Sequence, residues 1–173
     1  FQDVTNDFVA NGKVPQNEMW TADQNRLLNT LKRWLRYEYD MQNKWDFVPY
    51  AVEWDFGRKN GKPVRMSLDD GRSFSIDGRI DRIDKNGDKL FVTDYKLSST
   101  PDTNDFIDGI DLQMPIYFLA VNEQKDIKVA GGGYLSLKYT NRSPNIKLDD
   151  DQKIPFTTKY ADVFAGAVDK WNA

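Results

Sequence analysis

Acidic and basic side chains alternate with apolar ones in residues 75–96. The first half of this segment carries Arg79 and Asp81, and the second half carries Asp94 and Lys96. Two carboxylates can hold a hard divalent cation through their oxygens. A lysine beside that cation can orient a water molecule and offset negative charge on a phosphate. These residue types therefore suit metal-assisted hydrolysis of a phosphodiester bond.

The composition restricts the chemistry further. The 173-residue chain contains no histidine and no cysteine, and its net charge is -3. Thiolate and imidazole metal sites, disulfides and histidine-dependent nucleophiles are therefore excluded. The charge gives no bulk attraction to nucleic acid, so any such binding needs a local groove and a metal ion. The lack of cysteine fits the cytoplasm, which is the predicted location.

A β-hairpin is expected to bring the charged residues together. Asn86-Gly87 is a strong signal for a two-residue turn. Counting outward from that turn sets Arg79 opposite Asp94 and Asp77 opposite Lys96. Residues that lie directly opposite each other share a face of the sheet, so the acids and bases emerge on one side.

In this register Asp81 and Asp94 are diagonal neighbours, with Cβ atoms within about 7 Å, close enough to share one cation. The alternative is a solvated face with cross-strand ion pairs, each of which contributes little. The apolar residues Ile83, Leu90 and Val92 are predicted on the same face. They indicate partial burial, and buried charges usually have a partner or a ligand.

The surrounding elements are predicted from periodicity. Residues 1–20 contain breakers that exclude a long helix, and Thr21 with Gln24 forms a capping box for a helix whose apolar stripe ends at Tyr39. Its off-stripe cations are either a solvated face or the flank of a phosphate track: Arg26, Lys32, Arg33 and Arg36. Strands are predicted at Tyr50–Phe56, Pro63–Leu68, Arg72–Asp84, Lys89–Leu97 and Ile127–Leu137, and helices at Leu112–Asn122 and Lys159–Trp171.

Further features of the sequence qualify these predictions. Pro115 requires its helix to begin nearby, and the three glycines from Gly131 permit a close backbone approach. Residues 141–153 are predicted to be a polar linker, and the acidic run Asp149–Asp151 is expected to be solvated. We expect one domain over 1–173, and no stretch is apolar enough to span a membrane.

Three sequence blocks resemble the PD-(D/E)XK nuclease superfamily, in particular the nuclease domains of RecB and AddB helicase–nucleases. Gly78–Asp84 reads G-R-I-D-R-I-D, Thr93–Lys96 contains D-Y-K, and Asp111–Tyr117 is similar to an L-Q-L-P-L-Y helix. The resemblance covers roughly 49–137, the expected core. It implies an α/β fold of the restriction-endonuclease type, with a mixed central sheet flanked by helices.

The resemblance also implies roles for individual residues. Asp81 and Asp94 would hold Mg²⁺ with the backbone carbonyl of Tyr95, and Mn²⁺ would substitute for it. Lys96 would be the catalytic lysine. Glu53 lies where this group often has a glutamate, which would be either a structural residue or a further metal ligand.

Gln113 and Tyr117 are four residues apart, so they share one helix face. They would reach the DNA or the scissile phosphate, or else pack the helix on the sheet. DNA would lie along a basic run that is otherwise a solvated turn: Arg58, Lys59, Lys62 and Arg65.

The sequence departs from the resemblance at two places. The group commonly places a histidine or acid on an earlier helix, and no replacement is identifiable, so we expect that helix upstream of Phe1. AddB-type members also carry four cysteines for an iron–sulfur cluster, and none is expected here.

The chain is therefore predicted to be a fragment of a recombination-repair helicase–nuclease. It would act as an exonuclease on single-stranded DNA, beside a helicase domain or partner subunit. The alternatives are an inactive nuclease-like module that binds DNA or protein, and a β-rich carbohydrate- or protein-binding domain, which the many aromatic residues favour.

Overall fold

The computed structural model describes residues 1–15, 17–58, 61–67, 71–102, 105, 110–124 and 128–147. Its elements are α1 (Gln2–Ala10), α2 (Glu18–Gln42), β1 (Val48–Phe56), β2 (Val64–Ser67), β3 (Ser73–Ile76), β4 (Gly78–Asn86), β5 (Lys89–Lys96), α4 (Gln113–Gln124), β6 (Lys128–Ser136) and β7 (Asn141–Lys147). The predicted helix Lys159–Trp171 and the acidic run Asp149–Asp151 lie outside the described residues.

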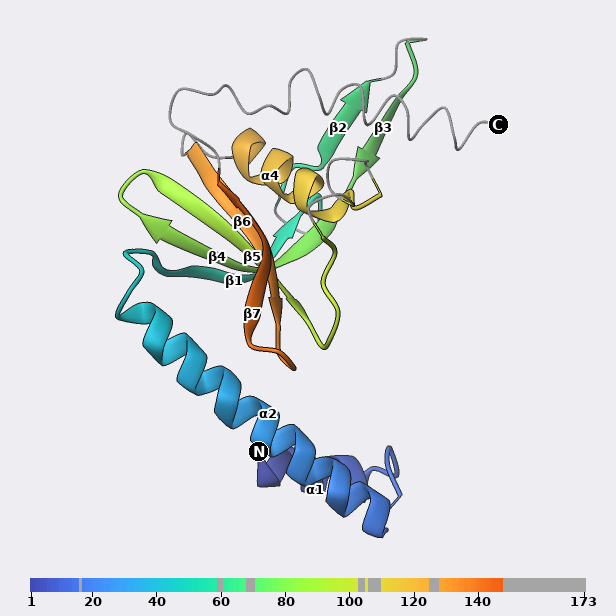
Figure 1. Cartoon of the computed structure of the whole chain (residues 1–173). Coiled ribbons are helices and arrows are strands. Elements are labelled where there is room, and N and C mark those ends of the chain that lie inside the picture. Colours follow the sequence, from blue (N-terminus) through green and yellow to red (C-terminus); the bar gives the residue numbers. More distant parts are fainter. Residues whose placement is uncertain are drawn as a thin grey trace.

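A five-stranded mixed sheet forms the centre of the molecule (Figure 1). Its strand order is β1-β4-β5-β6-β7, and only β5 and β6 run parallel. Helix α4 lies in the crossover between these two strands and covers one face, as a parallel connection requires. The short strands β2 and β3 form a separate two-stranded sheet. The structure confirms the predicted mixed α/β fold.

The core lies between the sheet and α4. Ile83, Leu90 and Val92 are buried there together with Phe118 of the helix, as their alternation in the hairpin predicts. Gly132 of β6 allows the helix to come close, because a Cβ at this position would lie 2.5 Å from Cε1 of Phe118. This confirms that the glycine run serves a close approach.

Aromatic residues cover part of the opposite face of the sheet. Trp45 and Phe47 pack edge-on against Phe91 of β5, with ring centroids 4.7 and 5.9 Å away. Trp34 of α2 packs edge-on against Tyr95, at 5.8 Å. The last turns of α2 and the following loop therefore hold the helix to the sheet.

The prediction for the start of α2 was wrong. The helix begins at Glu18, and the side chain of Asn17 accepts a hydrogen bond from the backbone N–H of Trp20, so the cap precedes Thr21. Of the residues on α2, only Glu38 is fully buried. Leu35 is 58% and Tyr39 is 68% exposed. The predicted apolar stripe is therefore only partly covered in the described part of the chain.

Two strand predictions also need correction. The expected strand Arg72–Asp84 divides at Asp77 into β3 and β4, which belong to different sheets. Residues 141–147, predicted to be linker, form β7, which pairs with β6. A short helix, α1, precedes Gly12, in keeping with the predicted absence of a long one. No helix among the described residues has the length and apolar character to cross a bilayer.

Candidate active site

The β4–β5 hairpin has a different register from the one predicted. Asn86 pairs with Lys89, so Gly87, with φ 58°, and Asp88 form the turn. Every pair is shifted by two positions along β5, and Ile83 now faces Val92. Because side chains alternate with a period of two, a shift of two leaves each residue on its predicted face.

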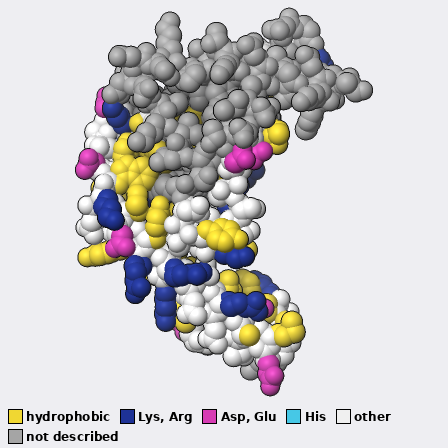
Figure 2. Space-filling model, in the orientation of Figure 1, with side chains coloured by type: hydrophobic (Ala, Val, Ile, Leu, Met, Phe, Trp, Pro, Cys, Tyr) yellow, Lys and Arg dark blue, Asp and Glu magenta, His cyan; other side chains and the backbone are white. Residues whose placement is uncertain are grey.

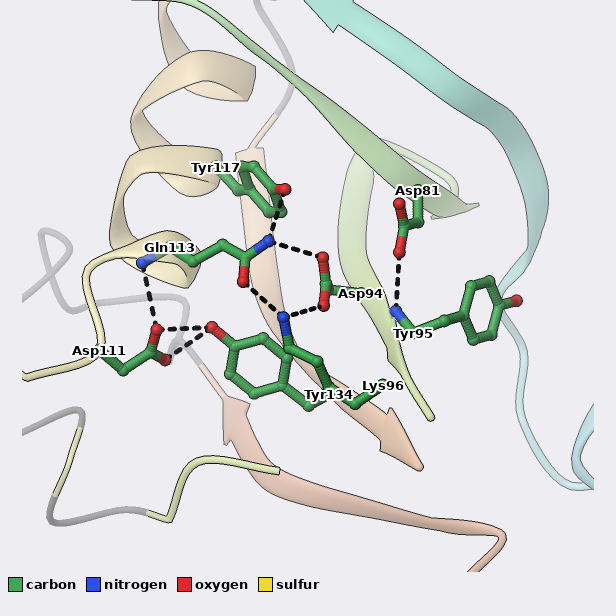
Figure 3. Close-up of polar contacts among 8 residues, drawn as sticks. All are labelled: Asp81, Asp94, Tyr95, Lys96, Asp111, Gln113, Tyr117 and Tyr134. Atoms are coloured by element: carbon green, nitrogen blue, oxygen red, sulfur yellow. Dashed lines mark hydrogen bonds and ion pairs between the residues drawn. The ribbon is translucent and has the colours of Figure 1, made fainter. Parts of the chain in front are cut away.

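The hairpin pairing ends before the charged residues. The last pair is Arg82 with Thr93, and continuing the register would set Asp81 opposite Asp94. Asp81 instead accepts a hydrogen bond through Oδ2 from the backbone N–H of Tyr95, at 2.8 Å (Figure 3). The first carboxylate of the predicted metal site is therefore fixed to the main chain of β5.

Asp94 is the most deeply buried acid of the site, with 3% of its surface exposed. Its Oδ1 accepts a hydrogen bond from Nε2 of Gln113, at 2.8 Å, and its Oδ2 lies 2.9 Å from Nζ of Lys96. Burial raises the pKa of Asp94, Lys96 lowers it, and the charges of Asp81 and Asp111 raise it again. The net shift of this pKa is upward, so the surroundings of Asp94 do not fully compensate its negative charge.

Gln113, at the start of α4, links the acid to the lysine. Its Oε1 accepts from Nζ of Lys96, at 2.7 Å, and its Nε2 donates to Asp94 and to the hydroxyl of Tyr117, at 2.7 Å. Burial raises the pKa of Tyr117 to about 12, so this hydroxyl keeps its proton at neutral pH. The Tyr117 hydroxyl accepts this hydrogen bond and so holds the Gln113 amide in place.

Asp111 and Tyr134 complete the network and were missed from the sequence. The Tyr134 hydroxyl lies 2.7 Å from both oxygens of Asp111, and Nζ of Lys96 lies 5.0 Å from the centre of the Tyr134 ring. Burial is the largest of the causes that raise the pKa of Tyr134. Asp111 also accepts from the backbone N–H of Gln113, a cap-like contact that an Asp just before a helix could have indicated.

The other predicted site residues lie elsewhere. Glu53, whose backbone has φ 49°, pairs with Arg79, which also pairs with Asp55. Asp77 pairs with Arg58 at 2.7 Å, and both side chains are half exposed. Neither Asp77 nor Arg79 therefore joins Asp94, contrary to the predicted cluster.

The predicted basic run follows β1 and reaches β2. Arg65 is exposed on β2, Lys62 just precedes that strand, and Lys59 lies outside the described residues. Gln113 and Lys96 contact Asp94, and neither of them belongs to this run. A role of the basic run in DNA contact stays a prediction.

The donor set of the site fits a hard divalent cation. Asp81, Asp94 and the carbonyl of Tyr95 offer oxygen ligands only. Oδ2 of Asp94 is buried and accepts no hydrogen bond, although it lies beside Lys96. Within the described ranges, no group of three or more His, Cys, Asp or Glu residues is arranged to hold a metal. Two carboxylates and one main-chain carbonyl oxygen would therefore be the protein ligands of the ion.

Comparisons with known proteins point to one family. A family model described as the PD-(D/E)XK nuclease superfamily matches residues 2–172. The chain is also similar to two proteins that are each named as the B subunit of an ATP-dependent helicase/deoxyribonuclease. It is 32% identical over 119 residues to that of Exiguobacterium sibiricum, covering 62% of this chain and 10% of the relative. It is 32% identical over 143 residues to that of Clostridium acetobutylicum, covering 73% and 12%. The chain thus spans about a tenth of these relatives' length.

Proposed function

Because this chain belongs to the PD-(D/E)XK nuclease superfamily, we propose that it hydrolyses phosphodiester bonds of DNA with a divalent metal ion. Asp81, Asp94 and the backbone carbonyl of Tyr95 would hold the ion. The observation that carries this proposal is the charge of the site. The charges of Asp81 and Asp111 act on the buried Asp94, and Lys96 forms an ion pair with Asp94 but with neither of the other two.

When bound, the metal would polarise the phosphate and lower the pKa of a water molecule. The ammonium group of Lys96 would orient that water and offset charge on the phosphate. Gln113 would hold Lys96 at this position through the hydrogen bond to Nζ. Tyr117 and the Asp111–Tyr134 pair would fix Gln113 and the Lys96 side chain from either side.

The finer parts of the function rest on the resemblance of the sequence motifs and stay proposals. We propose Mg²⁺ as the ion, with Mn²⁺ as a substitute, and exonuclease action on single-stranded DNA. The names of the relatives pair a helicase with a deoxyribonuclease, so a helicase domain or partner subunit would feed DNA to the site. We also propose the cytoplasm as the location.

Digestion of end-labelled single-stranded DNA with Mg²⁺ or Mn²⁺ tests the proposal. Lys96→Ala should slow cleavage by about 100-fold or more, which is the usual effect of removing one transition-state contact. Lys44→Ala, which removes an exposed cation after α2, should cleave like the parent chain. Equal rates for Lys96→Ala and the parent chain would remove Lys96 from the mechanism.

Calorimetric titration with Mn²⁺ separates a nuclease from a module that only binds DNA. The parent chain should bind the ion, and Asp94→Ala should lose the site because it removes a ligand. If the parent chain binds no metal and cuts no DNA, the nuclease proposal fails, and the inactive nuclease-like module becomes the better interpretation.

A further inference from the structure

A groove of about 820 Å³ lies between α2 and the ends of β5 and β6. Lys32, Arg33 and Arg36 line its helical wall, and Leu97, Ser98 and Lys138 line the wall on the side of the sheet. Figure 2 shows Lys and Arg side chains gathered over this part of the molecule. The proposed metal site does not use this groove, whose helical cations are those for which the sequence left open a solvated face or the flank of a phosphate track.

The groove is strongly basic although the whole chain is acidic. Five of its ten lining residues are Lys or Arg and none is Asp or Glu. Arg26 pairs with Asp23, at 2.6 Å. Arg33 donates only to the neutral Thr30 hydroxyl and the carbonyl of Lys138, and within the described ranges Lys32 makes no ion pair. These cations therefore form a surface that attracts anions.

The groove lies at the end of the strand that carries Lys96, the proposed catalytic lysine. Leu97 directly follows Lys96, and the backbone carbonyl of Lys96 accepts a hydrogen bond from the N–H of Leu137, at 2.9 Å. The carbonyl of Leu97 accepts from the N–H of Lys138, at 3.0 Å. Arg33 bridges the two walls through its contact with the Lys138 carbonyl, at 3.4 Å. The basic surface is thus tied to the end of the strand that carries Asp94 and Lys96.

We propose that this groove binds the phosphodiester backbone of a DNA strand whose path continues around the end of β5 to Lys96, on the other face of the sheet. This inference rests on the proposed nuclease function. Guanidinium and ammonium groups form charge-assisted hydrogen bonds with phosphate oxygens. No lining residue is aromatic, so the groove offers no platform for base stacking. Binding should therefore be independent of base sequence and strongly dependent on salt.

The test is DNA affinity without metal, so that binding is measured apart from cleavage. Fluorescence anisotropy with a labelled DNA of about 16 nucleotides, in EDTA, gives the affinity over about 50–200 mM salt. For a single strand, Lys32→Gln/Arg36→Gln should lower the slope of log K against log salt by about 1.4, because each phosphate contact contributes about 0.7. Lys138→Gln, on the opposite wall, should lower it by about 0.7. The matched control Lys13→Gln/Lys44→Gln removes the same charge outside the groove and should leave the slope unchanged.

The same titration with a duplex of equal length identifies the form of DNA that the groove binds. This is the form whose affinity falls more when the groove residues are substituted. If the groove variant and its control have equal affinities and slopes, the groove does not bind DNA. A loss of affinity without a change of slope would overturn the proposal as well, because no phosphate contact would be lost. If the groove variant binds DNA more weakly than the parent chain, and the parent chain cleaves no DNA, the proposal for the groove is supported and the proposed nuclease function is wrong.

Discussion

The two faces of the β4–β5 hairpin each carry a buried charged network, and the two networks are balanced differently. On the face toward α2, the guanidinium of Arg82 contacts Glu38 at 2.5 Å, Asp84 at 2.7 Å and the Tyr95 hydroxyl at 3.0 Å. Burial lowers the pKa of Arg82, but these partners raise it by more, and the net shift is upward. One cation therefore forms ion pairs with both neighbouring acids.

On the face toward α4, the cation satisfies fewer acids. Lys96 contacts Asp94, whereas Asp81 receives a backbone N–H and Asp111 receives a tyrosine hydroxyl and another N–H. Each network leaves one buried carboxylate oxygen without a hydrogen bond, on Glu38 and on Asp94, so that feature alone does not separate them. The difference teaches that uncompensated charge, and not burial of charge, distinguishes a candidate site from a structural ion pair.

The largest effect is expected from a substitution that disrupts the charged network on the face toward α2. Arg82→Met leaves Glu38 and Asp84 buried without their shared cation and should reduce the free energy of unfolding by about 3–5 kcal/mol. Urea denaturation followed by circular dichroism measures this change. A loss below about 1 kcal/mol would mean that the Arg82 network contributes no more than an exposed ion pair.

The second largest effect is expected from a substitution in the network on the face toward α4. Gln113→Leu removes the amide that holds Lys96 and should lower the cleavage rate by about 100-fold, because small misplacements of catalytic groups are costly. Single-turnover digestion measures this rate. Leu119→Met, elsewhere on α4, is the control and should cut DNA at the parent rate. If Gln113→Leu cuts DNA equally well, Lys96 does not depend on Gln113 for its position.

A smaller effect of opposite sign is expected for Asp94→Asn. The raised pKa of Asp94 means that the folded state disfavours its ionised form, so at neutral pH the charge lowers stability. Its removal should stabilise the chain by about 0.5–2 kcal/mol while it abolishes metal binding. Thermal unfolding without metal checks the gain. The matched change Asp84→Asn, on the other face, should destabilise the chain. If both substitutions change the stability equally, the two networks do not differ in charge balance.

The smallest effect concerns the exposed pairs of Arg79. Hydrogen bonds with Glu53 and Asp55 raise the pKa of Arg79, but water screens these contacts. Arg79→Gln should change neither the melting temperature nor the DNA cleavage rate measurably. A large loss of cleavage would show that Arg79 belongs to the site despite its position.

The sequence predicted the hairpin, its faces and the helix that carries Gln113, because periodicity two and the Pro115 constraint act locally. It did not predict the register. Asn86-Gly87 is the better turn dipeptide, yet Asn86 pairs with Lys89, and a shift of two residues keeps every apolar side chain buried. Burial therefore could not choose between the two registers.

Other features depended on long-range contacts that no local pattern records. Tyr134 lies in a buried strand, where a tyrosine is indistinguishable from an ordinary core residue until Asp111 and Lys96 are placed beside it. Thr21 gave a good capping box, but Asn17 provides the cap four residues earlier. Asp77, at the break between β3 and β4, pairs with Arg58, a contact that the sequence alone could not reveal.

Tyr95 belongs to both faces of the hairpin. Its ring meets Trp34, its hydroxyl meets Arg82, and its backbone N–H holds Asp81. A tilt of α2 would therefore pull on the same peptide unit that orients the Asp81 carboxylate. A force on the exposed part of α2 would therefore reach the Asp81 carboxylate through Tyr95, without any contact with Asp81 itself.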